Sequence, residues 1–163
     1  MRVDLEALRP TSTAQRRKRV DALIKDIATH PDNFEMSEFY NVDDDEPEDE
    51  YGPRLDPRWN LPLQSFRHTC GTTLCMAGFA AAHATPNART ASYHGQPEDG
   101  ESDPIVTGDH VSKIAQAWLG LEDDQARQLF YATSLDVLRA TTILRHYRDT
   151  GEVSEALLDI LRR

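Results

Sequence analysis

One stretch of the chain would be apolar on almost every side if it formed a helix. Apart from Cys75 and His83, residues 74–84 (LCMAGFAAAHA) hold only apolar or small side chains. A helix without a polar face is buried on most sides, and its alanines and glycine let neighbouring helices approach closely. Thr72 is a suitable N-cap. We therefore expect a helix over 72–84 at the centre of the core.

The segments around this helix have the apolar spacing of amphipathic helices. Residues 11–30 place apolar side chains on one face behind a Thr11 or Ser12 cap, and the C-terminal unit, 109–163, contains four short helical patterns. A chain of 163 residues has the size of one domain. We predict a mainly α, single-domain bundle (1–163) of about five to six helices. The expected inward residues include Val20, Leu23, Ile24, Ile27, Val111, Ile114, Trp118, Leu129, Phe130, Leu135, Leu138, either Thr142 or Ile143, Tyr147 and Leu158, with Gly120 and Gly151 as helix stops.

Two long loops are expected between the helices. Residues 41–66 are acidic and rich in proline, and residues 85–108 are rich in Gly, Pro, Ser and Asp without an apolar period. Residues 33–42 fit either a short helix or an extended segment. Clean alternation is absent elsewhere, and IVT at 105–107 is the only strand candidate.

Negative charge is concentrated in one part of the chain. The net charge is -10, and residues 31–60 contribute eleven acidic and two basic side chains. Such a balance disfavours direct nucleic-acid binding, which needs clustered Lys and Arg. Seven of the eight residues at 43–50 are acidic, and these are the candidate partner-binding residues: Asp43, Asp44, Asp45, Glu46, Glu48, Asp49 and Glu50.

This acidic run suggests an interaction protein that binds a protein partner with a basic surface. Complementary charge would speed association and make it sensitive to salt. The partner could be a host or defence protein whose nucleic-acid groove the run imitates, which would make the chain an inhibitor. A solubilising loop without a partner explains the composition equally well.

A second, basic cluster lies in the first helix. Arg16, Arg17, Lys18 and Arg19 point in most directions around a helix over 11–30, so they do not form a docking stripe. We interpret them as a solvated helix face in preference to a phosphate or acidic-partner site.

The cysteines and histidines around 68–84 allow several interpretations. His68, Cys70 and Cys75 could bind zinc, but a fourth ligand would have to come from elsewhere in the chain. Cys75 in a first helical turn could be an activated nucleophile, although apolar surroundings raise a thiol pKa. A Cys70–Cys75 disulfide is a third possibility. We favour structural cysteines and no metal site.

Other functional classes have weaker support. Residues 112–130 loosely resemble a helix-turn-helix, the pattern of a DNA-binding regulator, but the second helix would begin with Glu122, Asp123 and Asp124, which repel DNA. The chain lacks a P-loop, a nucleotide-binding glycine motif, a nucleophile elbow and HExxH, so we expect no enzyme and no cofactor. Without a signal peptide or a membrane span, the expected location is the cytoplasm.

Four short motifs in a fixed order carry a family resemblance. They are FEM at 34–36, CGTTLCMAG at 70–78, LGLEDDQARQLF at 119–130 and TGEV at 150–153. In this order the chain resembles small, mostly uncharacterised proteins of actinobacteria and their phages, with the pattern CGTxxCxAG, LGLxxxQAxxLF and TGxV. The resemblance implies a helical fold and a phage or mobile-element origin. It implies no activity, and a virion structural role remains an alternative.

Overall fold

Helices make up most of the structure. The computed structural model describes residues 4–36, 40–42, 72–85, 89–90, 105–106, 108–132 and 134–162, with side chains at 4–36, 75–85, 111–132 and 134–162. The predicted mainly α fold is confirmed. The helices in these ranges are α1 (Leu5–Leu8), α2 (Thr13–Thr29), the short 3-10 turn η1 (Pro31–Asn33), α3 (Met76–Ala84), α4 (Gly108–Leu119), α5 (Asp123–Phe130), α6 (Val137–Thr150) and α7 (Glu155–Leu161).

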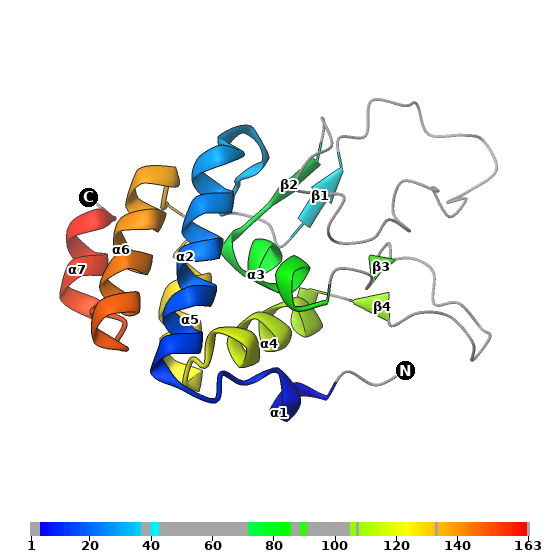
Figure 1. Ribbon diagram of the computed structural model, residues 1–163. Coiled ribbons are helices and arrows are strands. Elements are labelled where there is room, and N and C mark those ends of the chain that lie inside the picture. The colour runs from blue at the N-terminus through cyan, green and yellow to red at the C-terminus, as the bar shows by residue number, and fades with distance from the viewer. Residues whose placement is uncertain are drawn as a thin grey trace, which may run out of the picture.

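Helix α3 forms the centre of the core, as its composition predicts. Every residue from Met76 to Ala82 is buried. Helix α3 packs most extensively on α4, and α2 packs most extensively on α6. Figure 1 shows α2 standing between α3 and α4 on one side and the α6–α7 pair on the other. One apolar cluster therefore contains side chains from every α-helix from α2 to α7.

The start of α3 differs from the prediction. Thr72 is not the N-cap, because Thr72–Leu74 form strand β2, which pairs antiparallel with β1 (Tyr40–Val42). Cys75, with an extended backbone, is the N-cap, and α3 begins at Met76. The β-branched threonines suit a strand, and pairing with a distant segment overrides the local capping signal. Of the two alternatives for 33–42, the extended one therefore holds at residues 40–42.

A second strand pair interrupts the expected loop at 85–108. β3 (Arg89–Thr90) pairs in parallel with β4 (Ile105–Val106), which covers the first two residues of the strand candidate at 105–107; residue 107 lies outside the described residues. Helix α4 then begins at Gly108, one residue before the expected unit 109–163. Within 41–66, residues 43–66 lie outside the described residues, as do most of the remaining residues of 85–108.

The predicted helix ends are largely confirmed. Ser12 caps α2 by accepting a hydrogen bond from the Gln15 N–H at 3.1 Å. Gly151 ends α6 at φ +77°, and Gly120 follows α4 at φ +73°, both in the left-handed region that favours glycine. At Gly120, an added Cβ would also lie 2.6 Å from Cγ of Pro10, so the segment after α1 packs directly on the end of α4.

Two local features were not foreseen. Helix α1 is only four residues long, and it begins at Asp4, whose carboxylate accepts hydrogen bonds from the Glu6 and Ala7 N–H groups. Leu138 was expected to face inward, but its exposed fraction is 72%. It occupies the first turn of α6, where the buried face passes instead through Ala140 and Thr141.

Candidate functional site

Most of the side chains that the sequence singles out lie outside the described residues. This holds for the acidic run 43–50 and for two of the possible zinc ligands, His68 and Cys70. The third possible ligand, Cys75, is among the described residues, as are His83 and the basic cluster of α2. These side chains, and a groove between α4 and α5, are the candidates that the structure itself defines.

Cys75 is a buried thiol at the beginning of α3. Its exposed fraction is 1%, and burial raises its pKa to about 11, outweighing the hydrogen bonds with the backbone of Ala77 and Gly78, which lower it. A thiol nucleophile reacts as its thiolate and has a depressed pKa. Cys75 therefore has the environment of a structural cysteine, in agreement with the favoured interpretation.

His83 joins three helices. Its Nε2 lies 3.0 Å from Oδ2 of Asp26 in α2, and its ring stacks on Trp118 of α4 with a centroid distance of 5.3 Å. The other carboxylate oxygen of Asp26, Oδ1, lies 3.0 Å from Nδ1 of His30. One carboxylate thus holds two histidines, and its side chain is only 11% exposed.

The sequence signal for this cluster is incomplete. Asp26 and His30 are four residues apart and share a helix face, so that half could have been found, but nothing in the sequence pairs Asp26 with His83. Within the described part of the chain, no three His, Cys, Asp or Glu side chains are placed to hold a metal ion. The arrangement links α2 to α3 and fixes the histidine rings.

The arginines of the basic cluster bind the ends of other helices. Arg17 donates to the backbone oxygens of Arg148 and Asp149, each at 3.4 Å, at the C-terminal end of α6. Arg16 lies over the ring of Tyr147, 5.4 Å from its centroid. Cations near a helix C-terminus interact favourably with its dipole. The expected solvated face is therefore wrong for Arg16 and Arg19, both of which are half-buried.

Arg19 makes the most contacts of this cluster. Its guanidinium donates to the backbone oxygens of Leu8 and, at 2.7 Å, Trp118, which belong to the ends of α1 and α4. It also lies 5.5 Å from the centroid of the Trp118 ring. Burial lowers its pKa. Arg19 therefore connects the C-terminal ends of α1 and α4 to the middle of α2 by hydrogen bonds.

Replacing Arg19 with leucine is expected to lower the free energy of unfolding by about 1.5–3 kcal/mol, the usual range for a lost charge-assisted hydrogen bond. The substitution keeps an apolar stem but leaves the Leu8 and Trp118 oxygens without this donor. Urea unfolding followed by circular dichroism measures the change. Lys18→Leu is the matched control, because Lys18 is exposed, and it should stay within about 0.5 kcal/mol. Equal losses in both variants would show that Arg19 contributes only charge.

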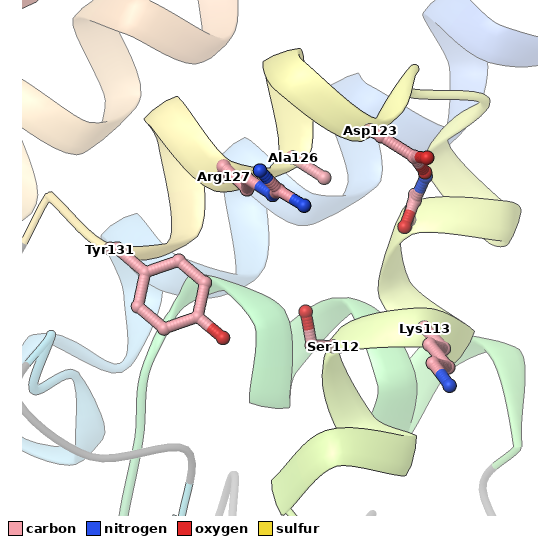
Figure 2. Close-up of a pocket in the computed structure, with 7 residues that line it drawn as sticks. Ser112, Lys113, Asp123, Ala126, Arg127 and Tyr131 are labelled. Carbon is pink, nitrogen blue, oxygen red and sulfur yellow. The ribbon is translucent and has the colours of Figure 1, made fainter.

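A polar groove separates α4 from α5. Its volume is about 320 Å³, and Figure 2 shows that it opens between the two helices. The polar lining residues are Ser112, Lys113 and Gln116 from α4, and Asp123, Arg127 and Tyr131 from α5 and the residue after it. The groove is therefore built by the segment that resembles a helix-turn-helix.

The two ends of the groove differ in charge. At one end, Nε2 of Gln116 donates to Oδ1 of Asp123 at 2.6 Å, which fixes that carboxylate. Toward the other end, the Arg127 guanidinium and the hydroxyls of Ser112 and Tyr131 face the open space between the helices (Figure 2). The Lys113 ammonium points away from it. Among the described residues, Arg127 forms no ion pair.

The groove was not predicted from the sequence. The helical spacing of Arg127 and Tyr131, whose N–H donates to the Arg127 oxygen at 3.3 Å, places both on one face of α5. That spacing does not reveal which face of α4 lies opposite. The juxtaposition with Ser112 depends on the turn at Gly120 and Leu121, which tertiary packing determines.

The comparisons with known proteins add no relative. No protein-family model, no curated protein and no solved structure matches the chain. In the described residues, no helix is both long enough and apolar enough to cross a bilayer.

Proposed function

We propose that the chain is a non-catalytic interaction protein whose acidic run, residues 43–50, binds a protein partner with a basic surface. The observation that carries this proposal is the density of charge, with seven carboxylates in eight consecutive residues. A partner that normally holds nucleic acid presents the required clustered Lys and Arg. The chain would then act as an inhibitor that occupies this surface. The resemblance to phage proteins suggests a host or defence protein in the cytoplasm as the partner.

The described residues support a binding role in preference to catalysis. The side chains that most often perform chemistry are engaged in holding the fold: the Cys75 thiol is buried, and His83 is fixed between Asp26 and Trp118. The Tyr147 hydroxyl donates to the Leu119 oxygen at 2.9 Å, and burial raises the pKa of this tyrosine. These groups contribute to the stability of the fold, which supports a role in which exposed side chains recognise a partner.

The arrangement of α5 disfavours the DNA-binding alternative. Glu122, Asp123 and Asp124 are exposed at the beginning of this helix, the end that a recognition helix usually points at bases and phosphates. Carboxylates at that position repel the phosphate backbone. The same three side chains are compatible with a protein that approaches a basic surface.

Neutralising part of the acidic run tests the proposal. The variant Asp44→Asn/Asp45→Asn/Glu46→Gln should bind a fluorescently labelled Lys- and Arg-rich peptide about tenfold more weakly than the wild type at about 50 mM salt. Fluorescence anisotropy measures the affinity. Raising the salt concentration to about 200 mM should reduce the difference, because exposed charges are screened.

A matched control separates local charge from net charge. The variant Asp124→Asn/Glu152→Gln/Asp159→Asn removes the same number of carboxylates from exposed positions on the described surface. We expect less than a twofold change in its affinity for the peptide. Equal weakening of both variants would mean that only net charge matters. Failure of the wild type to bind the peptide would contradict the proposal itself.

A further inference from the structure

We infer that the groove between α4 and α5 binds a phosphate group at the end formed by Arg127, Ser112 and Tyr131. None of the residues that line this site belongs to the acidic run, and the inference does not depend on the proposed function. Its volume of about 320 Å³ lies at the lower end of the range for small-molecule sites. The groove can therefore hold a small phosphorylated molecule or one phosphorylated side chain of a partner.

The charge of Arg127 is the first argument. The chain has 28 acidic and 18 basic side chains, so an exposed arginine has many possible carboxylate partners. Arg127 nevertheless forms no ion pair within the described structure, and its guanidinium faces the groove (Figure 2). A guanidinium offers a planar set of donors that matches the oxygens of a phosphate.

The hydroxyl groups around Arg127 are the second argument. Ser112 extends from α4 and Tyr131 follows the last turn of α5, so donors reach the same space from two helices (Figure 2). A tetrahedral phosphate accepts hydrogen bonds in several directions, whereas a planar carboxylate accepts them mainly in one plane. Donors that converge from both walls therefore favour phosphate over carboxylate.

The carboxylate of Asp123 determines where the phosphate lies. Its Oδ1 is held by Gln116 at 2.6 Å, so this end of the groove is negative and repels an anion. The phosphate consequently occupies the end near Tyr131, and the uncharged or cationic part of the ligand points toward Asp123. The overall charge of -10 weakens anion binding at every site, and an isolated phosphate should bind with a dissociation constant between about 0.1 and 10 mM.

Titration with inorganic phosphate tests the site on the full chain. Phosphate replaces chloride during the titration, so that the ionic strength stays constant. The amide resonances of residues around Ser112 and Arg127 in two-dimensional NMR spectra should then shift, and the shifts should saturate. Arg127→Gln should weaken binding at least tenfold. Arg145→Gln is the matched control, because Arg145 is an exposed arginine of α6 and should leave the affinity unchanged. Ser112→Ala gives an intermediate loss.

Titrations with other anions identify the class of ligand, and some of their outcomes would overturn the proposal. Acetate at equal ionic strength should bind more weakly than phosphate, and tighter acetate binding would overturn the phosphate assignment. Tighter binding of free phosphoserine than of inorganic phosphate would point to a phosphorylated partner, and tighter binding of a sugar phosphate to a metabolite. Shifts that never saturate, or that persist in Arg127→Gln, would overturn the site. The variant neutralised at 44–46 should bind phosphate at least as well as the wild type, which keeps this test independent of the acidic run.

Discussion

Replacing Phe79 with alanine is expected to lower the free energy of unfolding by about 3–5 kcal/mol, the usual cost of deleting a buried aromatic side chain. Phe79 is fully buried in the middle of α3. Its ring lies 6.2 Å from the ring of Phe34, at an interplanar angle of 43°. The substitution leaves a cavity where α3 meets the residues that follow η1. Urea unfolding followed by circular dichroism measures the loss.

Two further variants define the scale for this experiment. Phe79→Leu keeps most of the apolar volume and should cost no more than about 1.5 kcal/mol. Leu138→Ala removes a leucine that is 72% exposed, so it should stay within about 0.5 kcal/mol. A small effect of Phe79→Ala, comparable to that of Leu138→Ala, would contradict the central position of α3 in the core.

The parts of the fold that follow from local signals could be predicted. In α2, a serine N-cap precedes four apolar residues with helical spacing, and the structure buries all four: Val20, Leu23, Ile24 and Ile27. Gly151 ends α6 because a left-handed residue is required there. The burial of α3 follows from its lack of a polar face. Each of these signals lies within a few residues of the element that it determines.

The features that depend on distant contacts could not be predicted. Thr72 has the chemistry of an N-cap, but its segment becomes a strand because Tyr40–Val42 lies beside it. The roles of Arg17 and Arg19 require the ends of α6 and α4 to be near α2. Leu138 continues the apolar period of α6 but extends past the edge of the core. In each case the outcome depends on which distant segments pack against the residue and which do not, and periodicity does not reveal this.

Of the two candidate sites, one could be predicted from local sequence and the other depends on tertiary packing. The acidic run at 43–50 is evident from composition, whereas the groove between α4 and α5 requires the relative placement of two helices. Ser112 and Arg127 are ordinary residues of amphipathic helices in the sequence. They become a site only because the turn at Gly120 brings their helices together. A linear pattern therefore finds charge density more readily than convergent side chains.

Cys75 is expected to react with a thiol-specific reagent at pH 8 at least about a hundredfold more slowly in the native chain than in concentrated urea. Burial raises its pKa to about 11 and leaves the side chain 1% exposed, so both the thiolate fraction and the access of the reagent are reduced. The experiment uses a Cys70→Ser background, in which Cys75 is the single cysteine. Absorbance of the released chromophore gives the rate.

The raised pKa also predicts how stability changes with pH. The native thiol keeps its proton up to about pH 11, whereas the unfolded thiol loses it near its ordinary pKa of 9.0. The contribution of the protonated thiol to stability is therefore complete below that pH and is lost as the pH rises toward 11. It amounts to about 2–3 kcal/mol by linkage. Urea unfolding at several pH values should show this decline, and Cys75→Ala should make it smaller by the contribution of the thiol.

The comparison with Cys75→Ala isolates the thiol, because burial also raises the pKa of Tyr147 and gives a decline of the same sign. The two readouts together separate the interpretations of the opening stretch of α3. A structural cysteine is slow to react and destabilises the chain at alkaline pH. The contrary result would be fast labelling of the native wild-type chain that is blocked when zinc is added. It would show a thiolate ligand, and His68 and Cys70 would again be candidates for its partner ligands.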